Sequence, residues 1–395
     1  MKTITNGIIL KGYDLTPTKS NMLIDEGKII EISDKIYKGE IIDVSGAIIC
    51  PSFLNGHTHI GDSIIKDCGD GKSMDDLVKP PLGLKHLALS RSSDDEIISA
   101  MKDSMWEMLK TGTTHFIDYR EGGLKGIELL KKAASEIPIN PIILGRDPIF
   151  HNNTASAINI RKTTIKLLEN CDGIGVSGLN EVRSEVCEII VEECFKRNKI
   201  SSIHVGEYLK LQEKSIKETG KTEIERAIEL NFQLLIHSTY PKENDIKLIS
   251  ENNKILTICP RSNGTLSLGI PPFLDFKKNG IKTLLGTDNI MFNSPNLMRE
   301  MEYSLKALRA KYKTYINPKD ILKLSTVEGS NNLDKNNSSF YSVVNKSVIE
   351  EGNDARLFIS KLISKNPYLN IINRVENENV IATINKNKFL YWNKR

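Results

Sequence analysis

Residues 48–59 read IICPSFLNGHTH, an apolar run that ends in two histidines separated by one residue. The run has the composition of a buried β-strand, and side chains two positions apart on a strand point to the same face. His57 and His59 are therefore expected to project together from the end of one strand. An HxH pair alone is a weak signal, but two imidazoles side by side are a natural pair of metal ligands.

Seven further apolar runs follow this one, separated by amphipathic helical stretches such as DEIISAMKDSMWEMLKTG (95–112) and NPKDILKLSTVEGSNNL (317–333). The strands predicted after the first cover residues 113–120, 140–146, 173–178, 201–207, 233–239, 255–263 and 282–289. Eight strands that alternate with helices are typical of an α/β fold of the (β/α)8 TIM-barrel type. In such a barrel the carboxyl ends of the strands meet at one mouth, which carries the active site.

Both ends of the chain have a different pattern. Residues 1–50 alternate short β-type runs with turn signals such as Asn6-Gly7. Further β-type runs are predicted near the carboxyl end, at 354–362, 368–375 and 379–393. We expect the two ends to pair into a small β-sandwich domain.

The domain boundaries follow from these patterns. The sandwich is expected to consist of residues 1–50 plus 340–395, and the catalytic barrel of residues 51–339. The stretch DKNNSSF (334–340) is expected to form an exposed connection between them.

Composition excludes several classes of function. Lys and Arg number 54 against 50 for Asp and Glu, spread along the chain, so there is no basic footprint for nucleic acid. No run approaches the ~18 apolar residues that a membrane span requires, and the N-terminus lacks a signal-peptide pattern. The six cysteines form no CxxC pair, which is typical of free thiols in a reducing cytoplasm. We expect a cytoplasmic protein whose partner is a small-molecule substrate.

Four of the seven histidines fall at predicted strand ends, namely His57, His59, His204 and His237. Asp288 follows the last strand, which closes a barrel beside the first. We expect His57, His59, His204 and Asp288 to hold one metal ion. Three nitrogens and one oxygen suit Zn²⁺, with Fe²⁺ as the alternative, and leave a position for a water whose pKa the metal lowers.

Two more residues are expected to act on that water. Glu207 follows His204 by three residues, and we expect it to take a proton from the water and pass it to the leaving nitrogen. His237 is expected to hydrogen-bond the water or the developing alkoxide. The alternatives are a surface ion pair for Glu207 and a buried structural role for His237.

The order of five motifs resembles the amidohydrolase superfamily, in the branch of cytosine deaminase, guanine deaminase, chlorohydrolases and the S-adenosylhomocysteine and methylthioadenosine deaminases. These motifs are HTH (57–59), HVGE (204–207), IHST (236–239), CPRSN (259–263) and GTDN (286–289). The resemblance extends over nearly the whole chain, including EGNDARLFI (351–359). It implies the same metal ligands, a proton-shuttling Glu207, His237 and Asp288 assisting the attacking water, and a homodimer.

The sequence also departs from the superfamily. Binuclear members carry a carboxylated lysine at the end of the fourth strand, and GIGVSGLNE (173–181) contains no lysine. We therefore expect one metal, with Glu181 as the alternative bridging carboxylate. After the second and third strands the chain reads DYREGG (118–123) and GRDP (145–148), which are not the substrate signatures of the adenosine-type deaminases. The resemblance does not fix the substrate.

Arg120, Arg146 and Arg261 each follow a predicted strand end. We expect them to bind a carboxylate, a phosphate or a polar ring, with Glu121 neutralising one of them. The alternative is that they brace neighbouring loops by ion pairs. The long insertion at 62–90 is expected to cover the substrate as a lid.

The remaining histidines, His86, His115 and His151, are expected to be structural, in the lid, a strand interior and a loop. Together these observations favour a hydrolytic deaminase that acts on the amino or amidine carbon of a small heterocycle or nucleoside-like substrate and releases ammonia. The alternative in the same fold is an imidazolonepropionase-like or chlorohydrolase-like enzyme that opens a cyclic amide or cleaves another C–N or C–Cl bond. A metal-binding scaffold without catalysis would predict damage to the ligand set, and the sequence has none.

Overall fold

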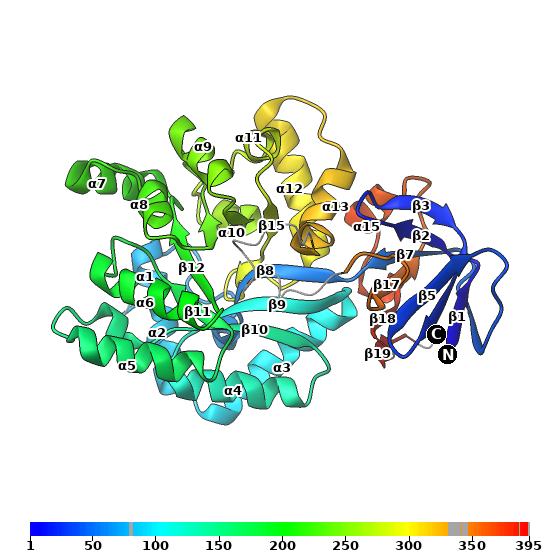
Figure 1. Ribbon diagram of the computed structural model, residues 1–395, viewed down its shortest axis with the longest axis horizontal. Helices are drawn as coiled ribbons and strands as arrows, with labels where there is room; N and C mark the ends of the chain where they lie inside the picture. The colour runs from blue at the N-terminus through cyan, green and yellow to red at the C-terminus, as the bar shows by residue number, and fades with distance from the viewer. Residues whose placement is uncertain (79–81, 331–339, 341–346, 387, 394–395) are drawn as a thin grey trace.

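The computed structural model describes residues 1–78, 82–330, 340, 347–386 and 388–393. Its centre is a ring of parallel strands that are hydrogen-bonded in chain order, except that the last pairs with the first (Figure 1). The strands are β8 (Phe53–His59), β9 (Thr113–Arg120), β10 (Asn140–Gly145), β11 (Gly173–Val176), β12 (Ile200–Val205), β13 (Leu234–His237), β14 (Ile255–Ile258), β15 (Thr283–Leu285) and β16 (Asp288–Asn289).

The last strands close the ring. β15 pairs with β14, and β16, which follows two residues later, pairs with β8. The register sets Asp288 opposite Thr58, between the two histidines of the HTH motif. The predicted TIM barrel is confirmed, and its closure places the predicted carboxylate beside the predicted histidine pair.

Helices surround the barrel (Figure 1), and most of them contribute buried apolar residues to its core. They include α3 (Asp94–Lys110), α4 (Gly123–Ser135), α5 (Ala157–Leu168), α6 (Ser184–Lys196), α7 (Leu209–Thr219), α8 (Glu223–Glu229), α9 (Glu243–Glu251), α11 (Phe273–Lys278), α12 (Leu297–Tyr312) and α13 (Pro318–Ser325). Local sequence explains where they begin. Ser93 and Glu96 form a capping box before α3, and Asn317 caps α13 with Pro318 in its first turn.

Most of the predicted barrel strands are shorter in the structure than in the sequence analysis, and two of them show why. The run 48–59 divides at Ser52: β7 (Ala47–Pro51) pairs with β17 (Arg356–Lys361) in a flanking sheet, and only β8 enters the barrel. Both parts are buried throughout, because the run passes from one core directly into the next, so hydrophobicity alone could not reveal the division. After β14 the chain turns at Cys259 into α10 (Pro260–Thr265), since Pro260 suits the first turn of a helix.

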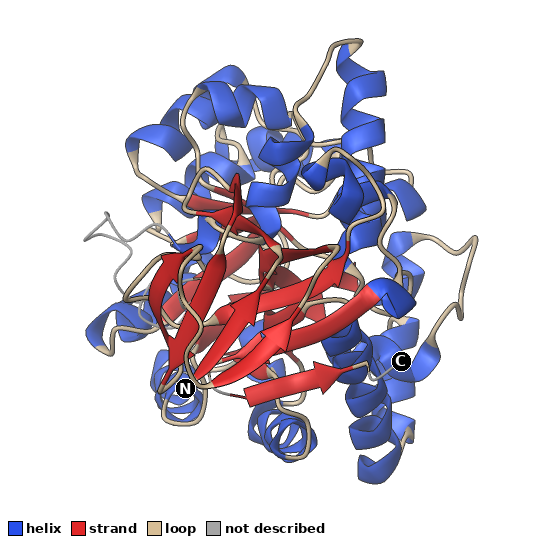
Figure 2. Ribbon diagram, turned by 90° about the vertical axis from the view of Figure 1, so that its right-hand side faces the viewer, coloured by secondary structure: helices blue, strands red, loops and turns tan. Residues whose placement is uncertain are grey.

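Two sheets from the chain ends flank the barrel, and Figure 2 looks at them from their side of the molecule. One has the order β5-β4-β1-β6 and the other β19-β18-β17-β7-β2-β3. Their remaining strands are β1 (Lys2–Thr5), β2 (Ile8–Lys11), β3 (Thr16–Lys19), β4 (Asn21–Asp25), β5 (Lys28–Ser33), β6 (Glu40–Asp43), β18 (Val380–Asn385) and β19 (Lys388–Trp392). Ile4 and Met22 of the first sheet share one buried cluster with Ile49 and Leu357 of the second. The sandwich built from both chain ends is confirmed, whereas its boundaries at residues 50 and 340 stay predictions.

One predicted strand is wrong. Residues 368–375 were expected to be β-type, but the structure has a helix, α15 (Pro367–Asn373). Asn366 caps this helix by accepting from the amides of Tyr368 and Leu369, and Pro367 occupies its first turn. These start signals outweigh the β propensity of the two isoleucines that follow. Of the connection predicted at 334–340, only Phe340 lies among the described residues, and its side chain is buried.

Among the described residues, no helix combines the length and the apolar composition needed to cross a bilayer.

An aromatic contact joins the barrel to the sandwich. The rings of Phe53 on β8 and Phe358 on β17 are fully buried, with centroids 4.7 Å apart. Gly112 makes room for them: its φ is +86°, and a Cβ there would lie 2.7 Å from the Phe358 ring. The contact between the barrel and the sandwich therefore depends on the ring of Phe358, which fills a tight space.

Replacing that side chain should weaken the whole fold. We expect Phe358→Ala to reduce the free energy of unfolding by about 3–5 kcal/mol, because it removes a buried ring and leaves a cavity. The measurement is the midpoint of urea unfolding followed by circular dichroism. Tyr37→Ala, at a side chain that is 62% exposed, is the control and should shift the midpoint little. Equal shifts in both variants would contradict this role for Phe358.

Candidate metal centre and active site

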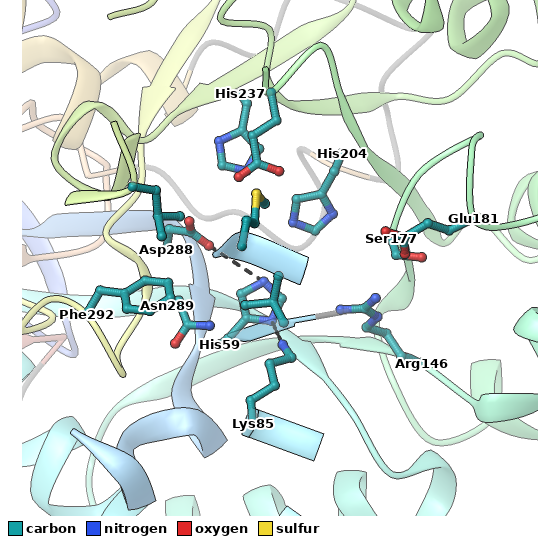
Figure 3. A pocket seen from close by; sticks show the side chains of 14 residues that line it. His59, Lys85, Arg146, Ser177, Glu181, His204, His237, Asp288, Asn289 and Phe292 are labelled. Carbon is teal, nitrogen blue, oxygen red and sulfur yellow. Dashed lines mark hydrogen bonds and ion pairs between the residues drawn. The ribbon is translucent and has the colours of Figure 1, made fainter. Parts of the chain in front are cut away.

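Four side chains from three separate strands converge at the mouth of the barrel. The candidate ligand atoms of His57, His59, His204 and Asp288 all lie within 4.8 Å of one another. The His57 Nε2 atom is 3.2 Å from His204 Nε2 and 3.2 Å from Asp288 Oδ1, and His59 Nε2 is 3.6 Å from the same oxygen. His59, His204 and Asp288 are seen from close by in Figure 3. The structure brings together all four predicted ligands.

The donor set fits a cation. The Nδ1 atom of His204 is 3.1 Å from the Val176 carbonyl oxygen, and that of His59 is 3.2 Å from Glu121 Oε1. Both oxygens only accept, so each Nδ1 carries the hydrogen and each Nε2 turns a lone pair toward Asp288. Several lone pairs and a carboxylate facing one another in a buried space are stable together when a cation lies between them. Three nitrogens and one oxygen suit one divalent ion such as Zn²⁺.

Ionisation of the same groups agrees with this fit. Burial lowers the pKa of the His59 imidazole to about 3 and that of His204 well below its usual value, so both rings are neutral, as metal ligands must be. Burial opposes ionisation of Asp288, but the hydrogen bond with His57 holds its pKa well below the ordinary value. The Ser262 hydroxyl donates to Asp288 Oδ2 at 2.6 Å, which leaves Oδ1 for the metal.

The backbone at this site is strained. Asp288, His237 and Ser238 have φ values of +59°, +72° and +46°, in the left-handed region that favours glycine. Such residues cost of order 1–3 kcal/mol each and cluster where the surrounding fold must aim a side chain at a fixed point. Two of these three residues are the predicted Asp288 and His237.

Glu207 and His237 lie beside the ligand set. Glu207 Oε1 is 3.6 Å from His237 Nε2, and these two residues with Asp288 place one atom each within 4.8 Å of one another. Burial, together with the Asp288 carboxylate, raises the pKa of Glu207 well above its ordinary value. Burial lowers the pKa of His237 to about 4. The pair therefore combines a carboxyl group whose proton affinity is raised with an imidazole whose proton affinity is lowered.

A pocket opens over these groups. It is lined by His59, Met74, Val78, Lys85, Arg146, Ser177, Glu181, His204, Glu207, His237, Leu266, Asp288, Asn289 and Phe292. Met74 and Val78 come from α1 (Met74–Val78), and Lys85 comes from α2 (Leu84–Arg91). The insertion that was predicted to be a lid thus forms one wall of the pocket.

The three predicted arginines do not converge. Arg146 lines the pocket and donates from Nη1 to Glu121 Oε1 at 3.0 Å. Arg120 lies beneath Gly61 and donates to the Glu121 carbonyl oxygen, and Arg261 pairs with the buried Glu300 of α12 at 3.2 Å. Only Arg146 among the three faces the pocket, whereas Arg120 and Arg261 brace the surrounding loops.

The sequence analysis missed Lys85 as a site residue. Its side chain is 3% exposed, and its Nζ lies 2.7 Å from Glu121 Oε1 and 3.1 Å from Asp62 Oδ2. Burial opposes the charge of Lys85, but the two carboxylates raise its pKa above the ordinary value. Burial likewise opposes ionisation of Glu121, whose pKa Lys85 and His59 hold well below the ordinary value. Nothing in the sequence LKHLALSR distinguishes this lysine from one on a surface helix.

The other three histidines lie outside the ligand set. His86 packs in the insertion with its Nε2 3.0 Å from the Val78 carbonyl oxygen, and His115 contacts Arg356 at 2.7 Å inside β9. His151 lies in the short η2 turn (Pro148–His151), 3.4 Å from the Ser177 hydroxyl.

Comparison with known proteins identifies the type of enzyme. Residues 48–389 match the model of the amidohydrolase family. A provisionally named aminohydrolase of Methanothermobacter thermautotrophicus is 44% identical over 99% of both chains. A 5-methylthioadenosine/S-adenosylhomocysteine deaminase of Thermococcus sibiricus is 27% identical over 88% of this chain and 82% of its own. The zinc complex of atrazine chlorohydrolase from Arthrobacter aurescens has the same fold, with a TM-score of 0.84, 15% identity, and coverage of 100% of this chain and 96% of its own.

The metal content of the protein tests the ligand set. We expect the purified wild-type chain to hold about one divalent ion, and His204→Ala to lose most of it, because removing one of the four ligands weakens binding of the ion. Elemental analysis after gel filtration is the measurement. His151→Ala removes a histidine outside the set and should keep the ion. Full metal content in His204→Ala would exclude this ligand set.

Proposed function

Because the chain belongs to the amidohydrolase family and is a hydrolase of carbon–nitrogen bonds, we propose that it is a metal-dependent deaminase of a small amino-substituted heterocycle or nucleoside-like molecule. The metal is Zn²⁺, with Fe²⁺ as the alternative, held by His57, His59, His204 and Asp288. The release of ammonia, rather than another cleavage of a carbon–nitrogen bond, is the most specific part of this proposal. The relatives named as deaminases support it.

One observation carries the deaminase proposal: a buried carboxyl group next to a four-ligand site. Glu207 is 7% exposed, and burial together with the Asp288 carboxylate raises its pKa well above the ordinary value. Ammonia leaves a ring carbon readily only when its nitrogen is protonated, so the reaction needs an acid at this position. Glu207 supplies that acid on the same strand end as the ligand His204.

The chain's own residues divide the remaining tasks. A divalent ion bound here would activate a water molecule and stabilise the negative charge that develops on the attacked carbon's substituents. Glu207 passes a proton from the water to the leaving nitrogen. His237 donates a hydrogen bond from one ring nitrogen to the oxygen of the attacking water. Asp288, which the Ser262 hydroxyl holds in place through Oδ2, accepts a hydrogen bond from the same water.

Arg146 lines the pocket and offers hydrogen-bond donors to the substrate. Its Nη1 donates to Glu121, and its Nε and Nη2 have no hydrogen-bond acceptor among the described residues. We propose that Arg146 binds acceptor atoms of the substrate, which a nitrogen heterocycle provides. Met74, Val78, Leu266 and Phe292 offer an apolar surface for its ring faces.

Location belongs to the same proposal. We propose that the protein works in the cytoplasm, since all six cysteines are free thiols and five of them are buried.

A screen for ammonia release tests the reaction. We expect ammonia from at least one member of a panel of aminopurines, aminopyrimidines, pterins and guanidino compounds that includes methylthioadenosine, S-adenosylhomocysteine and 5′-deoxyadenosine. Coupled glutamate dehydrogenase detects the ammonia, and mass spectrometry detects the exchange of an amino group for oxygen. Ring opening or chloride release without ammonia would instead indicate the cyclic-amide or chlorohydrolase alternative.

Substitution of Glu207 by glutamine, its amide counterpart, tests the role of this residue. Glu207→Gln should keep the metal and the fold but lower kcat about 10²- to 10⁴-fold, because the amide cannot transfer a proton. The measurement is kcat on the best substrate of the screen, with metal content determined in parallel. Glu213→Gln, on the exposed face of α7, is the matched control. Unchanged turnover at full metal content would remove Glu207 from the mechanism.

A further inference from the structure

One carboxylate oxygen connects the insertion to a metal ligand. Glu121 follows the end of β9, and its Oε1 lies 3.2 Å from His59 Nδ1, 2.7 Å from Lys85 Nζ and 3.0 Å from Arg146 Nη1. These three donors come from β8, from α2 in the insertion and from the end of β10. Lys85 and Arg146 reach toward His59 from two sides in Figure 3.

On the metal side, this oxygen determines the orientation of His59. An oxygen that receives N–H groups from a lysine and an arginine can only accept from the imidazole, so Nδ1 of His59 keeps its hydrogen. The Nε2 lone pair then points at Asp288 and the other ligands, 3.6 Å from Asp288 Oδ1. Partners of this kind fix the ring and raise the basicity of the ligand nitrogen. The Nδ1 atom of His204 faces a backbone carbonyl, that of Val176, whereas the Nδ1 atom of His59 faces a charged side chain.

On the other side, the same oxygen holds the insertion in place. Lys85 is buried, whereas Lys66 and Lys72 of the same insertion are exposed. Its ammonium group is shared between Glu121 and Asp62, and Asp62 in turn accepts from Asn289, the residue after Asp288, at 2.8 Å. A buried ammonium group that loses its partners is costly, so α2 stays docked only while these carboxylates receive it.

We propose that Glu121 is a positioning residue that orients His59 toward the metal, and that Lys85 docks the insertion on this same carboxylate. Glu121 then has two roles: it orients the metal ligand His59, and it holds in place the pocket wall that Met74, Val78 and Lys85 form. The inference rests on the metal centre of the proposed function but not on its substrate or on ammonia release.

The two residues should give different signatures. In Glu121→Gln we expect the affinity for Zn²⁺ to fall about 10- to 100-fold, because a neutral amide is a weaker partner for His59. Competition with a chromogenic chelator measures this affinity in the absence of any substrate. The amides of α2 should also exchange their hydrogens about tenfold faster, because Lys85 loses its closest anion. Glu128→Gln, on the exposed face of α4, is the control for both measurements.

In Lys85→Met we expect faster exchange in α2 without weaker Zn²⁺ binding. The substitution removes the ion pairs of the insertion, but it also removes a positive charge from the neighbourhood of the metal. Lys85→Arg keeps the positive charge, so its α2 amides should exchange more slowly than those of Lys85→Met. Lys72→Met should leave the exchange of α2 at the wild-type rate. The double variant Glu121→Gln with Lys85→Met should exchange no faster than the faster single variant, because both act through one contact.

Two results would overturn the inference. Zn²⁺ affinity equal to wild type in Glu121→Gln would show that this acid does not position His59. Exchange equal to wild type in Lys85→Met would show that the insertion is held by other contacts. A wild-type chain that binds Zn²⁺ and responds to these substitutions, yet releases no ammonia from any compound, would refute the proposed reaction and leave the inference intact.

Discussion

The site depends on the pairing of the last barrel strand with the first. Because β16 hydrogen-bonds to β8 with Asp288 opposite Thr58, the carboxylate arrives between the two histidines of one strand. His204 reaches the same point from β12, four strands around the ring. No local segment could hold these four groups together, and each alone in a buried space would be costly. Closure of the ring creates the ligand set, and the left-handed backbone at Asp288 is the local strain that accompanies it.

Much of this arrangement could be predicted from the sequence, because barrel topology converts a position at a strand end into a position in space. The apolar runs were long enough to count, and the spacing of His57 and His59 fixed their common face. Glu207 and His237 could be placed by the same reasoning, since each stands at or just beyond a strand end. The structure adds the distances and the burial that decide which of these groups carry a proton.

The features that the sequence did not reveal depend on partners distant in the chain. Arg261 looked available for substrate, but its partner Glu300 lies on α12 and is fully buried. Lys85 looked like a surface lysine, and only Glu121 and Asp62 make it part of the site. In residues 367–373 the cap at Asn366 outweighed the β-type composition. In each of these three places, a tertiary or capping contact overrides the structure that the local sequence pattern predicts.

The sandwich has a consequence for the order in which the protein can be completed during synthesis. Its strand β7 is made early and runs directly into β8, yet its neighbour β17 is made only after the entire barrel, and Leu357 then pairs with Pro51. Until those last residues leave the ribosome, one edge of β7 has unsatisfied backbone groups and an apolar face without cover. The nascent chain therefore depends on the growing barrel, or on a chaperone, to keep that edge from pairing with other chains.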